Sequence, residues 1–169
     1  MTSVLVTGAT GFLGEHVMRQ LLGSGNDISA FVRPGSQTGL LQQQGVKLRV
    51  GDLADRVALE RALLGVDVFL NIASLGFGHA ANVVAAAQAS GIGRAVFVSS
   101  ASVYTQLPNS SKTMRVQAER LIAESGLNYT ILRPTMIYGT PRDRNIWRLI
   151  IYLRRWPAIP VVGRGDALQ

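Results

Sequence analysis

The chain of 169 residues has no cysteine, two histidines and only 16% charged residues. Without cysteine there are no disulfides, thiolate nucleophiles or cysteine-bound metals. The two histidines, His16 and His79, lie on separate predicted helices, so we expect no metal site. The hydrophobic share of 47% is too high for a disordered chain. No apolar run reaches the ~20 residues of a membrane-spanning helix.

The start of the chain also lacks the features of a secretory signal. Met1 leads directly into an apolar, strand-like stretch, with no basic segment or small-residue cleavage site before it. With the absence of cysteine, this favours a cytoplasmic location. The length is enough for one domain with a proper core.

Acidic residues are scarce: seventeen Lys and Arg face ten Asp and Glu, for a net charge of +7. From Leu127 onward there are seven Arg and only two Asp. Such a basic end could meet phosphates, nucleic acid or an anionic membrane, or be a solvated or partner-facing surface, which we favour. No aromatic-interleaved basic motif or zinc-finger spacing occurs, so we expect no specific nucleic acid. Binding of nucleic acid or of an anionic membrane would depend on five arginines, Arg142, Arg144, Arg148, Arg154 and Arg155.

Strand-like and helix-like patterns alternate along most of the chain. The pattern predicts strands over residues 3–8, 27–33, 46–53, 66–74, 94–100 and 128–134. It predicts helices over residues 11–25, 39–45, 55–65, 79–91, 112–126 and 143–157. Such alternation implies right-handed βαβ units, and strands apolar on both sides require helices on both faces of the sheet. The expected fold class is a doubly wound α/β domain, a parallel sheet in order 3-2-1-4-5-6.

A glycine-rich loop, "VTGATGFLG", joins the first strand to the first helix. Gly8 allows the tight turn, Gly11 lets the backbone approach a pyrophosphate, and Gly14 lets the helix pack closely on the strand. The free N–H groups at the helix start would then hold phosphates. In this context, after a strand and before a helix, the loop predicts a dinucleotide site.

The segment "TGATGFLG" resembles the TGxxGxxG loop of the short-chain dehydrogenase/reductase superfamily. The nearest branches are the extended and atypical ones, including the NAD-dependent epimerase/dehydratase family. The segments "GDLAD", "NIAS", "FVSSASVY" and "ILRPTMIYG" resemble that family's segments in the expected order.

The resemblance implies a set of cofactor contacts beyond the glycine loop. Asp52 and Leu53 would flank the adenine, and Pro134 would lie beside the nicotinamide. Taken by themselves, Asp52 could be a turn residue and Pro134 a strand stop. The full predicted cofactor-binding set is Gly8, Thr10, Gly11, Phe12, Leu13, Gly14, Arg33, Asp52, Leu53, Asn71, Ile72, Ala73, Ser99, Arg115 and Pro134.

The end of the second predicted strand selects between NAD and NADP. An acid there binds the free ribose hydroxyls of NAD, whereas an arginine accommodates the extra phosphate of NADP. Arg33 ends this strand, and Pro34, Gly35, Ser36 and Gln37 follow without a carboxylate. A guanidinium can pair with a phosphate through two hydrogen bonds, so we predict NADP, with NAD as the alternative. The other interpretation is an exposed arginine without a ligand.

The superfamily's catalytic Tyr-x-x-x-Lys pair is absent, since no tyrosine has a lysine four residues later. Aligning Glu119 with the family helix puts Arg115 at the lysine position, where it could hold a ribose hydroxyl or a phosphate, and Ser111 at the tyrosine position. Ser100 matches the family's catalytic serine. Two tyrosines, Tyr104 and Tyr138, are candidate proton donors; the alternative is that both are packing residues.

Residues 1–140 therefore form the predicted dinucleotide-binding domain. Residues 141–169 form a helix and tail that resemble the start of a substrate lobe, of which the rest is missing. We expect redox or epimerase/dehydratase chemistry on a small carbonyl compound or nucleotide sugar. The alternative is a non-catalytic NADP-binding sensor or regulatory module, which the missing pair favours. The apolar side chains of the last helix predict a homo-oligomer.

Overall fold

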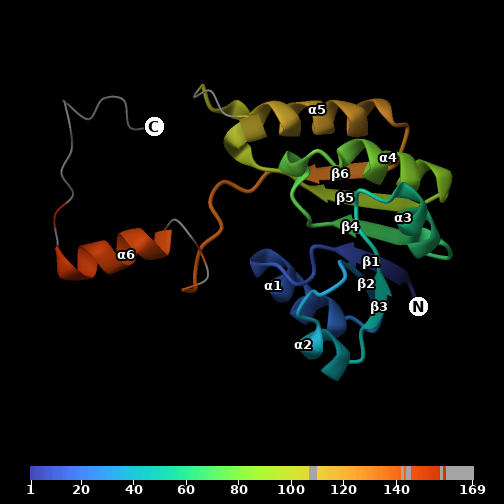
Figure 1. The fold of residues 1–169 in the computed structure, drawn as a ribbon, viewed down its shortest axis with the longest axis horizontal. Helices are drawn as coiled ribbons and strands as arrows, with labels where there is room; N and C mark the ends of the chain where they lie inside the picture. Colours follow the sequence, from blue (N-terminus) through green and yellow to red (C-terminus); the bar gives the residue numbers. More distant parts are fainter. Residues whose placement is uncertain (107–109, 142, 144–145, 157, 159–169) are drawn as a thin grey trace. The chain divides into compact units, whose positions relative to one another are not determined.

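The protein is described here by a computed structural model covering residues 1–106, 110–141, 143, 146–156 and 158. The chain divides into two compact units, Met1–Thr135 and Met136–Gln169. The first unit holds a sheet with helices around it, and the second contains one helix (Figure 1).

Six parallel strands form one sheet in the order β3-β2-β1-β4-β5-β6. The predicted fold class and strand order are therefore confirmed. Because β1 pairs with both β2 and β4, the chain reverses its direction of winding between β1 and β4. Ligands of doubly wound sheets bind outside the carboxyl ends of the strands at such a switch point. The strands are β1 Ser3–Thr7, β2 Asp27–Val32, β3 Lys47–Val50, β4 Val68–Asn71, β5 Arg94–Val98 and β6 Tyr129–Leu132.

Helices follow the strands in alternation, as the sequence pattern predicts. The first unit contains α1 Phe12–Leu22, α2 Gly39–Gln43, α3 Arg56–Leu63, α4 Ala80–Ala89 and α5 Ser110–Glu124, and the second contains α6 Ile146–Arg155. Asp55 caps α3 by accepting a hydrogen bond from the amide of Ala58, at 3.0 Å. Two short 3-10 turns, η1 Leu75–Phe77 and η2 Ala101–Tyr104, were not predicted, because four residues or fewer leave no periodicity to detect.

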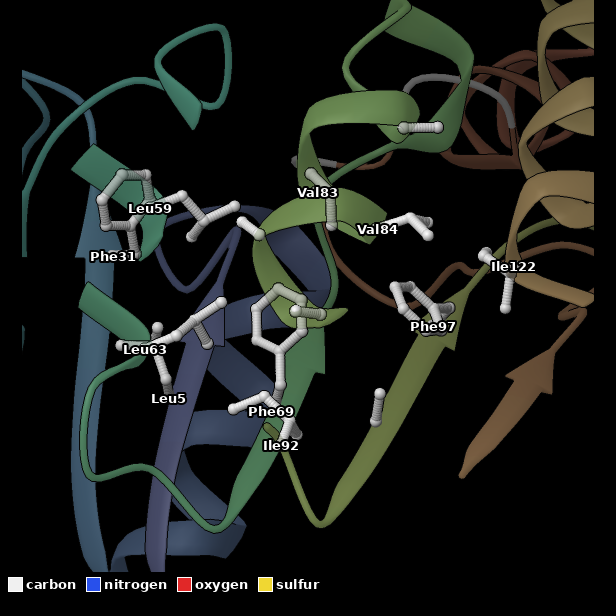
Figure 2. Packing of buried hydrophobic residues seen from close by; sticks show 14 of the residues in the cluster. Leu5, Phe31, Leu59, Leu63, Phe69, Val83, Val84, Ile92, Phe97 and Ile122 are labelled. Atoms are coloured by element: carbon white, nitrogen blue, oxygen red, sulfur yellow. The ribbon is translucent and has the colours of Figure 1, made fainter. Parts of the chain in front are cut away.

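Side chains alternate between the two faces of the sheet and build two cores. Val4 and Val6 point to one face, where they pack with Met18 of α1 and Leu41 of α2. Leu5 points to the other face, which α3, α4 and α5 cover. There Phe69 and Phe97 meet edge to face with ring centroids 6.1 Å apart, among the aliphatic side chains drawn in Figure 2. Because all six strands are parallel, their carboxyl ends lie at the same edge of this doubly covered sheet.

The fourth strand is shorter than predicted. The pattern favoured residues 66–74, but β4 ends at Asn71. Beyond it the amide of Ile72 still donates to the carbonyl of Thr7, and the chain then turns out of the sheet beside Gly8. The apolar Ile72 and Ala73 line a cavity instead of continuing the sheet.

The second unit contains a helix with strongly segregated side chains. None of the residues of α6 is buried, and Ile151 is 49% exposed. Two arginines, Arg154 and Arg155, occupy its last turn, where cations interact favourably with the helix dipole. In the described ranges, no helix is both long and apolar enough to span a bilayer.

Candidate functional site

A cavity of about 620 Å³ opens at the carboxyl edge of the sheet. Its walls come from the loops that follow β1, β2, β3 and β4, together with the start of α1. Strand β1 lies between β2 and β4, so the glycine loop that follows β1 occupies the middle of the site. A volume of this size lies within the usual range for small-molecule sites.

Eleven of the fifteen predicted cofactor residues line this cavity. They are Gly8, Thr10, Gly11, Phe12, Leu13, Gly14, Arg33, Asp52, Leu53, Ile72 and Ala73. The other four, Asn71, Ser99, Arg115 and Pro134, are not among its lining residues. The cavity thus brings together residues from four separate loops.

The glycine loop leaves the start of α1 open toward the cavity. Gly11 is the N-cap of α1, and no side chain caps the first turn. The first amides of a helix have no partner within the helix, so those of α1 are available to an anion. Gly8 has φ +73°, and a Cβ on it would lie 2.6 Å from the amide nitrogen of Ala73. Only glycine therefore fits between the first and fourth strand loops.

Asn71 supports the loops from beneath and does not face the cavity. Its side chain is 1% exposed, and its amide oxygen accepts a hydrogen bond of 2.7 Å from the hydroxyl of Thr7. Its amide nitrogen donates to the carbonyl of Ala73 at 3.0 Å. Asn71 thus fixes the ends of β1 and β4 relative to each other, and the next two residues, Ile72 and Ala73, line the cavity.

The turn after β2 places two donors on the cavity wall. The amide of Ser36 donates to the carbonyl of Arg33 at 3.1 Å, and Gly35 adopts φ +76° within this turn. Both Arg33 and Ser36 line the cavity. Ser36 was not in the predicted set, although its position three residues after Arg33 in a Pro-Gly turn could have indicated it.

The loop after β3 is fastened from two sides. A carboxylate oxygen of Asp52 accepts a hydrogen bond of 2.8 Å from the amide of Ala54, so Asp52 is a turn residue that also lines the cavity. The side-chain amide of Asn82, on α4, donates to the carbonyls of Leu53 and Ala54 at 3.3 and 2.8 Å. Helix α4 therefore holds this wall in place.

Three cavity residues between β4 and α4 were also missed. Ser74, Phe77 and His79 line the cavity, and the Phe77 side chain is 75% exposed. Phe77 belongs to η1 and is followed by Gly78, which has φ +83°. An aromatic side chain held in water at the edge of a cavity is a typical surface for stacking a flat ring. Its sequence signal, a phenylalanine between two glycines, is too general to be predictive.

A second polar group of side chains lies near the ends of β5 and β6. Arg133 makes hydrogen bonds to both carboxylate oxygens of Glu119, at 2.8 to 3.0 Å, and its guanidinium lies 5.7 Å from the ring centroid of Tyr104. Burial would raise the pKa of Glu119, but hydrogen bonding by Arg133 and Ser99 and the Arg133 charge outweigh it and lower the pKa. The buried Ser99 hydroxyl makes no well-aligned hydrogen bond, so its contact with this carboxylate is weak.

Two of the three candidate catalytic residues, Ser100 and Tyr104, are placed by the second 3-10 turn. Ser100 caps η2, its hydroxyl accepting from the amide of Ser102 at 3.2 Å. Tyr104 ends this turn and is 71% exposed. Pro134 accepts a hydrogen bond of 2.9 Å from the amide of Ala101, which ties β6 to the same turn. Tyr138 belongs to the second unit and is exposed.

The parallel sheet, its switch point and the glycine loop at an open helix start define a dinucleotide-binding Rossmann domain. A family model described as "NAD(P)H-binding" matches residues 8–148, and the chain belongs to this family.

Among known proteins, the chain is similar to reductases and to an epimerase. It is 35% identical over 136 residues to quinone oxidoreductase 2 of Escherichia coli, covering 77% of this chain and 47% of that protein. It is 33% identical over 197 residues to 2-alkyl-3-oxoalkanoate reductase of Stenotrophomonas maltophilia, covering 96% and 59%. The crystal structure of a nucleoside-diphosphate-sugar epimerase from Pseudomonas aeruginosa matches with a TM-score of 0.68 and 25% identity, covering 77% and 51%.

A structure of the E. coli quinone oxidoreductase complexed with NADPH also matches this chain. The TM-score is 0.68 at 33% identity, and the match covers 77% of this chain and 48% of that one. The chain thus spans about half the length of the curated relatives that it matches. The part matched by the family model includes the glycine loop and the loops after β1 to β4 that form the cavity.

Proposed function

We propose that the protein binds NADP(H) in this cavity, with the pyrophosphate at the start of α1 and the 2′-phosphate at the turn after β2. The observation that carries the proposal is the pairing of Arg33 and Ser36 on the cavity wall, in a turn without a carboxylate. A guanidinium and a hydroxyl suit a phosphate, whereas NAD-binding sites offer an acid to the ribose. The NADPH complex of the similar oxidoreductase supports this choice.

The proposed binding set follows the cavity wall. The amides of the first turn of α1 and the glycine loop hold the phosphates, and Asp52 and Leu53 flank the adenine. Ile72 and Ala73 lie along the middle of the cofactor, with Asn71 acting through its hydrogen bonds to Thr7 and Ala73. Ser99 and Pro134 lie at the ends of β5 and β6, toward the nicotinamide in this proposal.

The chemistry that we propose is reduction or epimerase/dehydratase chemistry on a carbonyl compound or a nucleotide sugar, supported by the similar reductases and epimerase. The bound dinucleotide would supply or accept a hydride. Ser100 is the proposed hydrogen-bond donor to the reacting oxygen, and Tyr104 or Tyr138 the proposed proton donor. A binding module without catalysis is the second candidate, because α5 presents Ser111 and Arg115 together where the family keeps a tyrosine and a lysine.

Calorimetric titration tests the cofactor proposal directly. We expect NADPH to bind about tenfold or more tightly than NADH, because only NADPH offers a 2′-phosphate to Arg33 and Ser36. Each titration is repeated at high salt, where a phosphate contact weakens. Equal binding of the two cofactors would contradict the NADP assignment, and binding of neither would contradict the function.

The second unit is proposed to be the beginning of a substrate lobe, with the domain boundary near residue 140, and to bring two copies of the chain together through α6. The exposed Leu149, Ile151 and Tyr152 of that helix support this contact, because exposed apolar groups gain by mutual burial. Sedimentation at micromolar concentration is expected to give at least twice the monomer mass, and the variant Ile151→Glu is expected to reduce it. A monomer throughout would contradict the proposal.

We also propose a cytoplasmic location for the protein, because reduced dinucleotides are available there.

A further inference from the structure

Arg115 of α5 has an unusual environment for a partly buried guanidinium. Its Nη1 donates to the hydroxyl of Ser111 at 2.8 Å and lies 3.5 Å from the hydroxyl of Ser102. The guanidinium packs against Gly76, where a Cβ would lie only 3.2 Å from Cζ and 3.3 Å from Nη2. The guanidinium is therefore enclosed by two turns, η1 and η2, and its own helix.

Among the residues that the structure describes, no carboxylate lies within ion-pair distance of the Arg115 charge. In the described part of the chain, ion pairs join Lys47–Asp27, Arg56–Glu60, Arg120–Glu124 and Arg133–Glu119, and Arg115 takes part in none. Arg133, the residue directly after strand β6, shows the contrast, since both oxygens of Glu119 neutralise it. Serine hydroxyls can orient a guanidinium but leave its charge intact. Even partial withdrawal of such a charge from water without a partner is unfavourable, so this arrangement suits an anion that arrives from outside.

The position of Arg115 relates it to the cavity. Gly76, against which it packs, lies between Ser74 and Phe77, and both of these line the cavity. Ser102, its other contact, lies two residues beyond the candidate Ser100 in the same turn. The guanidinium thus stands at the junction of the cavity edge with the turn that carries Ser100 and Tyr104. Its Nε and Nη2 make no hydrogen bond within the described ranges, so two donors remain for a ligand.

We propose that Arg115, with Ser102 and Ser111, binds an oxyanion of the substrate, a carboxylate or a phosphate. This inference rests on the proposed function, because the bound anionic group would orient the substrate carbonyl on which the proposed reaction acts. Two adjacent N–H donors of a guanidinium match the two oxygens of a carboxylate or phosphate, whereas a neutral substrate would leave the charge uncompensated. The class of substrate is therefore a small anionic carbonyl compound or a phosphate-bearing sugar, rather than an uncharged ketone or quinone.

The test measures anion binding separately from cofactor binding. Oxamate and inorganic phosphate are titrated into the wild-type protein with and without saturating NADPH, and the uncharged oxamide serves as the matched ligand control. We expect oxamate or phosphate to bind, oxamide not to bind, and Arg115→Gln to weaken anion binding about tenfold or more, with Arg115→Lys between them. If Arg115 binds the substrate anion, and not the ribose hydroxyl or cofactor phosphate that its place in the family alignment suggests, NADPH affinity should stay within about twofold. Arg120→Gln removes an exposed, carboxylate-paired arginine from the same helix and is the control variant.

The outcomes separate this inference from the proposed function. Anion binding that depends on Arg115, without any binding of NADPH, would support the anion site and overturn the cofactor proposal. NADPH binding without anion binding, or anion binding that Arg115→Gln leaves unchanged, would overturn the anion site. A loss of NADPH affinity above about tenfold in Arg115→Gln would assign the guanidinium to a cofactor phosphate and overturn the substrate assignment. Thermal unfolding of both variants, and the Arg115 Nε resonance followed during titration, distinguish a lost contact from a lost fold.

Discussion

Gly14→Ala is expected to abolish NADPH binding and to lower the free energy of unfolding by about 3 kcal/mol or more. A Cβ at this position would overlap the carbonyl oxygen of Gly8 and lie 2.8 Å from two backbone atoms of Ala9. Backbone atoms cannot rotate away as a side chain does, so the start of α1 must move from β1. That movement displaces the amides that face the cavity, and the phosphates lose their donors.

Calorimetry with NADPH and denaturant unfolding of the same samples measure the two effects. Gly39→Ala is the matched control, because Gly39 has open space around its Cβ position and begins α2 without a positive φ. We expect the control to bind NADPH normally and to be equally or slightly more stable. Gly11→Ala should be intermediate, since its Cβ would meet only one atom, the Gly8 carbonyl oxygen at 3.2 Å. A Gly14→Ala protein that binds NADPH like the wild type would refute the close-packing argument.

The fold was predictable because the local sequence signals, namely apolar runs, loop glycines and helix caps, agree with the packing of the folded chain. Val4, Leu5 and Val6 form one continuous apolar run, and the structure buries them alternately in the two cores. Gly11 and Gly14 are required by backbone contacts close in sequence, to Gly8 and Ala9, and Gly8 by its positive φ as well as by its approach to Ala73, so their spacing was visible. Asp55 was likewise readable as a helix start, and it does cap α3.

The rest of the site depends on contacts between residues far apart in the chain. Asn82 holds the loop after β3 from a helix about thirty positions away, and nothing in its own surroundings indicates that role. Phe77 and His79 face the cavity because η1 turns the chain there, and so short a turn has no sequence period. Arg115 was found through a family alignment, but its missing counter-charge is visible only once the neighbouring turns are in place.

Arg33→Gln is expected to remove most of the preference for NADPH over NADH. If Arg33 pairs with the 2′-phosphate, its loss should weaken NADPH binding by about 10- to 100-fold, the range for hydrogen bonds to charged groups. NADH, which lacks that phosphate, should bind within about threefold of its wild-type affinity. Glutamine keeps a polar side chain of similar length, so the comparison isolates the charge and the two-pronged geometry of the guanidinium.

The matched control for Arg33→Gln is Arg19→Gln, which removes one positive charge from the exposed side of α1 in the same unit. If long-range attraction alone favoured NADPH, both variants would lose affinity to a similar, small extent, and salt would remove the difference. A contact at the turn after β2 instead predicts a selective loss in Arg33→Gln that persists at high salt. Ser36→Ala should then give a smaller loss of the same kind, because it removes one neutral donor from the same phosphate position. Equal losses for NADPH and NADH in Arg33→Gln would place Arg33 against a part that the two cofactors share and contradict its role in selection.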